Sequence, residues 1–362
     1  MKKRTAGLII VLSLVLTFTT VLAVESNFLL NIEGFKKLAV ENSRQSAIDD
    51  LEIKARESAL EDAKHDAEFV SYTGTRSDMY GVGIKKEVTP LEAEANLEYA
   101  KKEKEENLEN LRLDVYKATL GLLLAQKELQ MEAEKLYILK EKYSMVEARY
   151  KEGKITDNDL YDAKYALDKK AIDKDKVEKK VQSAGLELKR LLNLKLDETP
   201  LKVEDELVLS TWEDIDIEKI VLEALNKSAD IFKKSEELKA KEKTLEVTGE
   251  YYKDGDFTYD DNKVNLETTK VGLEDAKTNL EVQIRNKYND ILTKKDKVEL
   301  AQQWEGIQEK KLDNAELKYK KGLISKEELF NAKEKFLDAQ YQKFAEIHDY
   351  NALKAEFEAL YK

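Results

Sequence analysis

A fifteen-residue stretch that occurs twice constrains the fold of this chain more than any other feature. The first copy, residues 150–164, reads YKEGKITDNDLYDAK, and the second, residues 319–333, reads YKKGLISKEELFNAK. The copies lie 169 positions apart (319 − 150), and each stands between long segments whose apolar residues recur at helical spacing. Each copy is therefore predicted to be the tip of a helical hairpin, and the fold must hold two such tips.

Both tips have the chemistry of a helix end followed by a helix start. Gly153 and Gly322 stand where a backbone of positive φ ends a helix, a conformation that glycine adopts at little cost. Thr156 and Ser325 each precede an acidic residue by three positions, which is the capping-box pattern of a new helix. A plain hairpin loop without a binding partner has the same pattern, so the tips alone assign no function.

The composition favours long helices over a β-rich fold. The 362 residues include two prolines, 13 glycines and no cysteine, which leaves little room for many short strands. With 38% charged and 42% hydrophobic residues, the apolar positions are thinly spread, as in elongated coiled coils. The net charge of −12 argues against nucleic-acid binding and fits solvated helix faces on which Glu and Lys alternate.

The N-terminus is predicted to be an export signal that spans residues 1–23. Lys2, Lys3 and Arg4 precede an apolar run, and small residues near position 23 fit cleavage before Val24. An uncleaved membrane anchor is the alternative, because the apolar run approaches the length that spans a bilayer. The segment thus predicts export across the cytoplasmic membrane.

A helix of about 60 residues is predicted between positions 91 and 150. One apolar series recurs every seven residues, as in a coiled coil: Leu122, Leu129, Leu136, Tyr143 and Tyr150. A second series lies on nearly the opposite face: Leu124, Met131, Ile138 and Met145. A helix with two apolar stripes needs neighbours on both sides, as in a wall of helices.

The return helix after each tip keeps a heptad frame that a lysine interrupts. Lys174 and Lys343 occupy matching positions, again 169 apart. A polar residue at such a position often sets the register of a coiled coil. The alternative is a ring of lysines that faces water inside an assembly.

The two halves of the chain follow one plan. The first repeat is assigned to residues 24–195, the linker to residues 196–215 and the second repeat to residues 216–362. The linker holds a short alternating run typical of a strand. Each repeat is expected to open with one helix, about residues 31–66 in the first, and the two openings align at an offset of 185. Connectors before the long helices, residues 68–90 and 247–262, are predicted to be short β-hairpins or irregular loops.

This plan resembles the TolC family of outer-membrane efflux ducts. The resemblance rests on the Tyr-x-x-Gly-x-Ile-Ser/Thr tips, on the opening helix of each half and on the run Leu191, Leu192, Asn193, Leu194, and it covers essentially the whole mature chain. It implies a mainly α fold of tandem-duplicated long antiparallel coiled-coil hairpins, one third of a trimeric α-barrel, with short β or irregular connectors. It also implies a homotrimer that meets a periplasmic adaptor protein and an inner-membrane pump, and that passes small molecules or peptides.

The resemblance gives roles to residues near the tips. The adaptor-docking residues would be Gly153, Lys154, Ile155 and Thr156 on one tip, and Gly322, Leu323, Ile324 and Ser325 on the other. Tyr150 and Tyr319 match the tyrosines that hold the resting tube closed, and Lys174 and Lys343 would be lumen or register residues. The connectors depart from the family, in which each half inserts two membrane strands at this place. A transmembrane strand needs about 9–11 residues, so two strands and a turn do not fit in connectors this short. They predict a truncated relative with little or no membrane β-barrel.

No catalytic constellation emerges from the sequence. His65 and His348 stand alone, and residues 153–156 lack the glycine order of a phosphate loop. Four aspartates, Asp254, Asp256, Asp260 and Asp261, lack the spacing of an EF-hand. We therefore expect no enzyme, no cofactor and no metal site. Two other classes compete with a duct: an exported structural coiled coil without a lumen, and a pump adaptor, which would need lipoyl-like and β-barrel modules beside a single hairpin.

Overall fold

A computed structural model describes residues 29–213 and 215–362, so the expected signal, residues 1–23, lies outside the described residues. The helices are α1 (Ile32–Glu41), α2 (Arg44–Phe69), α3 (Arg76–Gly83), α4 (Thr89–Lys151), α5 (Asp157–Leu191), α6 (Ile217–Lys227), α7 (Ala229–Tyr251), α8 (Phe257–Lys320) and α9 (Lys326–Glu358). A π-helical turn, η1 (Ile84–Val88), joins α3 to α4, and strands β1 (Leu29–Leu30) and β2 (Lys202–Val203) form a parallel pair. The expected mainly α fold of long antiparallel hairpins is confirmed.

The helix boundaries repeat between the two halves. The starts of α1 and α6 differ by 185 positions (217 − 32), as do those of α2 and α7 (229 − 44). Around the tips the offset is 169, both for the ends of α4 and α8 (320 − 151) and for the starts of α5 and α9 (326 − 157). With 63 and 64 residues, α4 and α8 are each about 95 Å long.

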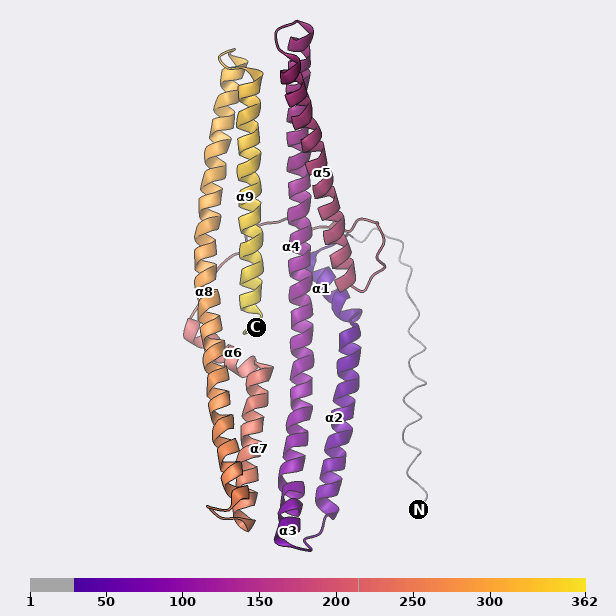
Figure 1. Ribbon diagram of the computed structural model, residues 1–362, viewed down its shortest axis with the longest axis vertical. Coiled ribbons are helices and arrows are strands. Elements are labelled where there is room, and N and C mark those ends of the chain that lie inside the picture. Colours follow the sequence, from indigo (N-terminus) through magenta and orange to yellow (C-terminus); the bar gives the residue numbers. More distant parts are fainter. Residues whose placement is uncertain (1–28, 214) are drawn as a thin grey trace.

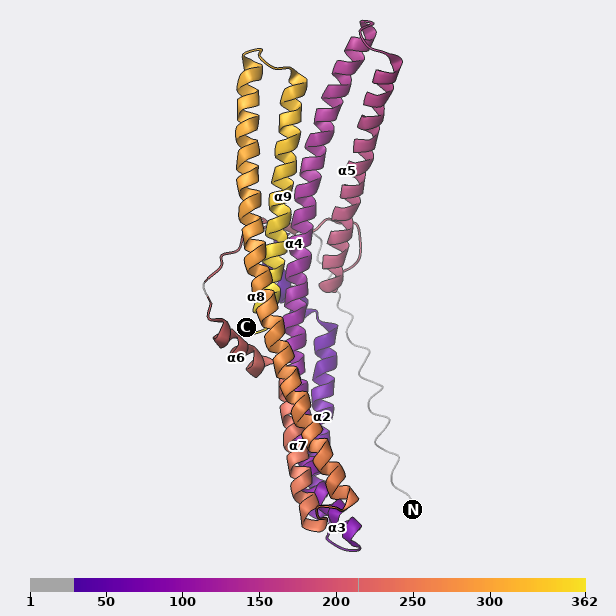
Figure 2. The ribbon, with the colours of Figure 1, turned by 60° about the vertical axis from the view of Figure 1, so that its left-hand side comes forward.

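Both tips lie at one end of an elongated molecule, and both connectors lie at the other end (Figures 1 and 2). Near the tips, α4 packs against α5 on one side and α9 on the other, and α8 packs against α9. Nearer the connectors, α2 and α7 are the neighbours of α4. The helices of the tip half therefore follow one another as α5, α4, α9 and α8, and α4 has the two neighbours that its two apolar stripes predict.

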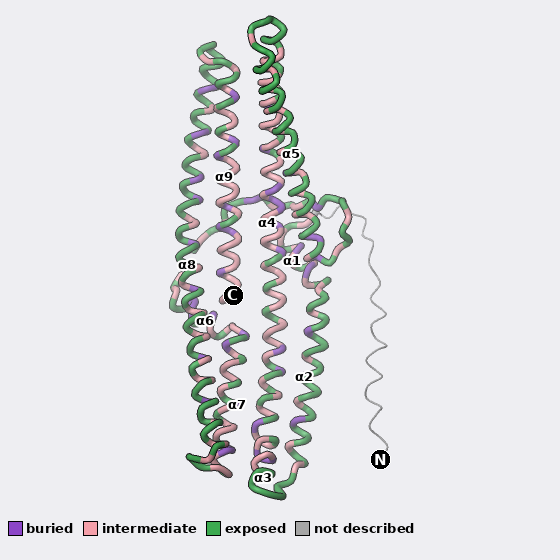
Figure 3. The backbone as a smooth tube through the Cα atoms, viewed as in Figure 1, coloured by how far each residue is buried: buried purple, intermediate pink, exposed green. Residues whose placement is uncertain are grey.

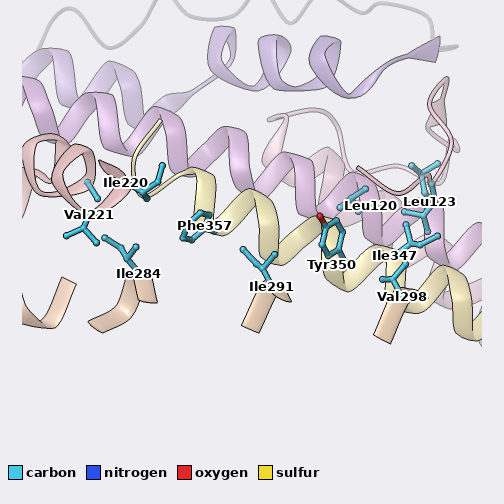
Figure 4. Close-up of a cluster of buried hydrophobic side chains, with 12 residues drawn as sticks. Leu120, Leu123, Ile220, Val221, Ile284, Ile291, Val298, Ile347, Tyr350 and Phe357 are labelled. Carbon is cyan, nitrogen blue, oxygen red and sulfur yellow. The ribbon is translucent and has the colours of Figure 1, made fainter. Parts of the chain in front are cut away.

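Buried residues are strung along the helices instead of gathering in one compact core (Figure 3). In the largest cluster, Ile284, Ile291 and Val298 of α8 recur every seven residues and are fully buried. They meet Tyr350 and Phe357 of α9, with residues of α4 and α6 closing the cluster (Figure 4). This heptad packing holds the second half against α4.

The opening of each half is two helices, not the single helix that the sequence predicts for residues 31–66. The chain bends at Asn42, where α1 ends, and Ser43 then caps α2 by accepting a hydrogen bond from the amide of Ser46 at 3.1 Å. Ser228 caps α7 in the same way, accepting from the amide of Ile231 at 3.3 Å. A capped restart explains why an apolar periodicity continues across the bend.

The predicted β-hairpins of the connectors are wrong, because both connectors are helices and tight turns. Thr75 and Asp78 form a capping box that starts α3, and the helical path then continues through η1 into α4. The widened π turn ends two residues before Pro90, whose ring clashes with the carbonyl four residues earlier in a regular helix. In the second connector, only a turn around Gly255 (φ 92°) separates α7 from α8.

The aromatic residues that suggested strands instead join the two connectors. The ring of Tyr80 lies edge-on to those of Tyr251 and Tyr252, with centroids 6.4 and 5.3 Å away. Arg76 pairs with Asp256 and stacks over Tyr252 at 4.1 Å from the ring centroid. The end of the molecule opposite the tips is thus a joint between the halves.

Candidate docking tips, seam and edges

Each tip is a tight helix stop built on a glycine with positive φ. Gly153 has φ 69° and Gly322 has φ 68°. The amide of Gly153 donates to the carbonyl of Tyr150 at 2.8 Å, and the amide of Gly322 donates to the carbonyl of Tyr319 at the same distance. The equivalent bonds close the two helices identically, so the repeated sequence produces a repeated shape.

A reciprocal capping box then starts each return helix. The carboxylate of Asp159 accepts from the amide of Thr156 at 2.9 Å, while the amide of Asp159 donates to the Thr156 hydroxyl at 3.3 Å. Ser325 and Glu328 repeat both bonds, at 2.8 and 3.1 Å. The backbone and side-chain hydrogen bonds of Thr156 lower the pKa of Asp159, and those of Ser325 lower the pKa of Glu328.

Acid is expected to loosen both tips. A carboxyl whose pKa is lowered by folding stabilises the cap above the ordinary carboxyl range and stops doing so as the pH falls through the lowered pKa. Amide exchange at residues 157–160 and 326–329, corrected for the intrinsic rate, should therefore accelerate below about pH 4. Asp159→Asn should already be fast at residues 157–160 at neutral pH and should respond little to acid. Acid acceleration of equal size in Asp159→Asn would contradict the role of the carboxylate.

The predicted docking residues surround these caps on the surface. Lys154 is exposed and Ile155 half-buried on one tip; Leu323 is exposed and Ile324 half-buried on the other. The two predicted gate tyrosines lie on separate tips, and both are partly exposed. The interaction with the carboxylate of Asp157 raises the pKa of Tyr150.

The two lysines that interrupt the heptads have different environments. Lys343 lies 2.6 Å from Glu305 of α8, with both side chains less than a fifth exposed. Lys174 pairs instead with Glu178 on its own helix, because Leu136 occupies the position equivalent to Glu305. This half-buried ion pair joins α9 to α8, which favours the register interpretation for Lys343.

The contact between the two hairpins, which we call the inner seam, went unnoticed in the sequence. Its apolar centre joins Met131 and Ile138 of α4 to Phe330 and Leu337 of α9. Ion pairs between α4 and α9 flank this centre: Lys135–Asp338 at 2.6 Å, Lys142–Glu334 at 2.7 Å, Glu141–Lys326 at 2.7 Å and Glu134–Lys333 at 3.3 Å. Apolar contacts flanked by opposite charges give a coiled coil its register.

The two outer helices expose apolar side chains on their free faces. On α5 these form the α5 edge: Tyr161, Tyr165 and Ile172, each more than 60% exposed. On α8 they form the α8 edge: Leu300, Trp304 and Ile307, between 44% and 66% exposed. Spacings of three, four and seven residues place each set on one helix face. Exposed apolar side chains that share one helix face are typical of interaction surfaces.

A cavity of about 1080 Å³ lies where α9 ends and α7 begins. Lysines and carboxylates from α4, α7, α8 and α9 line it in mixed order. At its wall, Glu356 of α9 pairs with Lys117 of α4 and, at 2.8 Å, with Lys287 of α8. Burial raises the pKa of Glu356, but these two hydrogen bonds outweigh it, so the pKa lies below its ordinary value.

Within residues 29–213 and 215–362, no helix has the length and apolarity needed to cross a membrane. In the same residues, no group of three or more His, Cys, Asp or Glu side chains is placed to hold a metal ion. Of the four aspartates near the second connector, Asp254 pairs with Lys263 at 3.2 Å and Asp256 with Arg76.

No protein-family model and no curated protein matches this chain, but solved structures do. The Campylobacter jejuni CmeC outer membrane channel aligns with a TM-score of 0.72 at 14% identity, covering 91% of this chain and 85% of the channel. The Vibrio cholerae outer membrane protein VceC gives 0.66 at 13% identity, covering 91% and 95%. The open state of the Neisseria gonorrhoeae MtrE outer membrane channel gives 0.65 at 14% identity, covering 91% and 88%. The described chain therefore has the fold of the TolC-family outer-membrane channels.

Proposed function

We propose that this protein is the exported duct of a tripartite efflux or type I secretion system. Three copies form an α-helical tube in the cell envelope, and its glycine tips dock onto a periplasmic adaptor protein bound to an inner-membrane pump. The observation that carries the proposal is the placement of both tips at the same end of one wall of helices. A single copy thus offers two adjacent docking tips, and a ring of copies offers a complete rim.

The exposed edges support a ring over a free-standing monomer. Each copy has an unpartnered apolar face on α5 at one side and on α8 at the other. A head-to-tail contact between two different faces closes into a ring when its rotation allows. The fold shared with outer-membrane channels supports the same assembly. The export that this role needs rests on the signal at residues 1–23.

Transport through such a duct needs no catalytic residue and no cofactor. The docking residues are residues 153–156 on one tip and 322–325 on the other, and among them Lys154 and Leu323 expose their side chains. Tyr150 and Tyr319 are the gate residues, since both lie in the last helical turn before a tip. Cargo consists of small molecules or peptides.

An exported structural coiled coil is the competing function, and oligomeric state separates the two. Light scattering on the mature chain should give three copies for a duct. A monomer or dimer at all accessible concentrations would refute the duct.

Proline at both tips should abolish docking. Gly153→Pro with Gly322→Pro forces φ near −65° where the backbone needs about +70°, and it removes the amide that closes each helix. Photo-cross-linking from position 154 to the adaptor should then disappear. Gly153→Asn with Gly322→Asn is the matched control, because asparagine tolerates positive φ, and it should keep the cross-link. Unchanged cross-linking in the proline variant would refute docking through the tips.

A further inference from the structure

We propose that the two tips differ in their chemistry, and that the second tip binds the more tightly, to a partner whose end brings carboxylates beside an apolar side chain. The first tip is residues 147–159, and the second tip is residues 316–328. Both lie at one end of the molecule (Figure 1). The assignment rests on the proposed function, since it takes docking through the tips as given, and it adds the chemistry that the adaptor must present.

The two tips share one backbone shape, so their side chains can be compared position by position. Gly153 and Gly322 have φ of 69° and 68°, and each glycine amide closes the preceding helix with a hydrogen bond of 2.8 Å. A reciprocal capping box starts the return helix in both tips. A shift of 169 positions therefore places each side chain of the first tip and its equivalent at the same point of the same shape.

The side chains on either side of the two glycines are different. Glu152, before the first glycine, corresponds to Lys321, and Lys154, after it, corresponds to Leu323. The ammonium group of Lys154 lies 2.6 Å from the carboxylate of Glu152, so these two charges cancel within the first tip. In the second tip Leu323 is 69% exposed. Lys321 beside it is exposed too, and it takes part in no ion pair within the part of the chain that the structure describes.

The other charges of the tips do not offset this difference. The cations at positions 149 and 151 of the first tip recur at 318 and 320, so both tips have them. Asp157 corresponds to Lys326, but Lys326 is held by Glu141 of the inner seam at 2.7 Å. In total the first tip has three basic and four acidic residues, and the second has four basic and three acidic residues. The second tip is therefore the positively charged one.

These side chains define the partner that fits the second tip. An exposed leucine gains from contact with an apolar side chain, and an unpaired lysine beside it attracts a carboxylate. At the first tip, the carboxylate of the same partner would compete with Glu152 for Lys154, and a charged lysine stands where the second tip has Leu323. An adaptor end that presents Asp or Glu beside an apolar residue therefore prefers the second tip.

Exchanging these side chains between the tips tests the assignment in the full mature chain. Lys321→Glu with Leu323→Lys gives the second tip the side chains of the first. Glu152→Lys with Lys154→Leu gives the first tip the side chains of the second and is the matched reverse exchange. Both variants keep the glycine and the capping box, so both tips keep their shape. Circular dichroism checks that the helices are unchanged.

Photoreactive side chains at Asn158 and Glu327 report contact with the adaptor at each tip, because these equivalent residues are exposed in the first turns of α5 and α9. In the otherwise unchanged chain, the cross-linking yield from position 327 should exceed that from position 158 by about fivefold or more. Lys321→Glu with Leu323→Lys should lower the yield at 327 by about tenfold, since it reverses a charge and removes an apolar contact. The reverse exchange should raise the yield at 158 by about fivefold.

Two synthetic helical hairpins test the chemistry of the partner. They are identical except for the two residues that flank a leucine in the turn, which are glutamates in one hairpin and lysines in the other. The glutamate hairpin should bind the mature chain about fivefold more tightly at low salt, and its advantage should shrink as the salt concentration rises. The advantage should vanish in the variant Lys321→Glu with Leu323→Lys.

Equal cross-linking yields at 158 and 327, unchanged by either exchange, would overturn the difference between the tips and leave the duct and its docking in place. Tighter binding of the lysine hairpin would overturn the acidic partner. A chain that cross-links to the adaptor from neither tip would overturn docking through the tips and this assignment together.

Discussion

Replacing Phe357 by alanine should lower the free energy of unfolding by about 3–5 kcal/mol, the loss usual for a buried phenylalanine. The side chain is fully buried near the end of α9. Its ring centroid lies 6.2 Å from that of Trp212 in the linker, 6.4 Å from that of Tyr288 in α8 and 5.4 Å from that of Tyr361. The substitution leaves a cavity where the linker, α8 and α9 meet, so all three should loosen together.

Urea unfolding followed by circular dichroism measures this loss. In a Trp304→Phe background, Trp212 is the remaining tryptophan. When Phe357→Ala is added, the emission of Trp212 should shift to the red at a lower urea concentration than the one at which the helical signal is lost. Phe257→Ala is the matched control, because Phe257 is 85% exposed, and it should change stability by no more than about 0.5 kcal/mol. Equal losses from both substitutions would contradict the role of this aromatic cluster.

The tips could be predicted from the sequence because their chemistry is local. Positive φ at Gly153, and a cap at Thr156 paired with Asp159, depend only on residues a few positions apart. The second half repeats the same residue pattern at its own tip, so two separate stretches of sequence support the same prediction. Long heptad runs likewise predicted that α4 needs neighbours on two sides.

The connectors could not be predicted, because tertiary contacts decide their structure. Alternating apolar residues between 79 and 84 are typical of a strand, yet they lie on α3 and η1. Tyr80 among them packs against Tyr251 at the end of α7. The capping box of Thr75 and Asp78 was the local signal for a helix there. Aromatic residues that pack between the two halves alternate along the sequence of one half, and this spacing is the same as that of a strand.

The edges escaped prediction for a different reason. Apolar residues at 161, 172, 300 and 307 fit the helical periodicity as well as the buried ones do. Sequence alone does not say which helix lies beside which, so it cannot separate a seam within the chain from a seam between chains. The order α5, α4, α9, α8 makes that separation.

Two equivalent isoleucines should respond in opposite ways to truncation. Ile138 is fully buried in the inner seam, so Ile138→Ala should cost about 2–5 kcal/mol at every protein concentration. Ile307 is 46% exposed in one copy, so Ile307→Ala should change the dilute chain by no more than about 0.5 kcal/mol. Once copies assemble, Ile307 is covered and its truncation should lower the melting temperature at high concentration, because association stabilises the folded chain.

Thermal unfolding across a wide range of protein concentration separates the two effects. The melting temperature of Ile138→Ala should lie below that of the wild type by a constant amount at every protein concentration. The melting temperature of Ile307→Ala should equal that of the wild type in dilute solution and fall below it as the protein concentration rises. An Ile307→Ala curve parallel to that of Ile138→Ala would mean that both positions are covered within one chain. A curve identical to wild type at all concentrations would remove Ile307 from any interface, because the same side chain at the equivalent buried position cannot be truncated without loss.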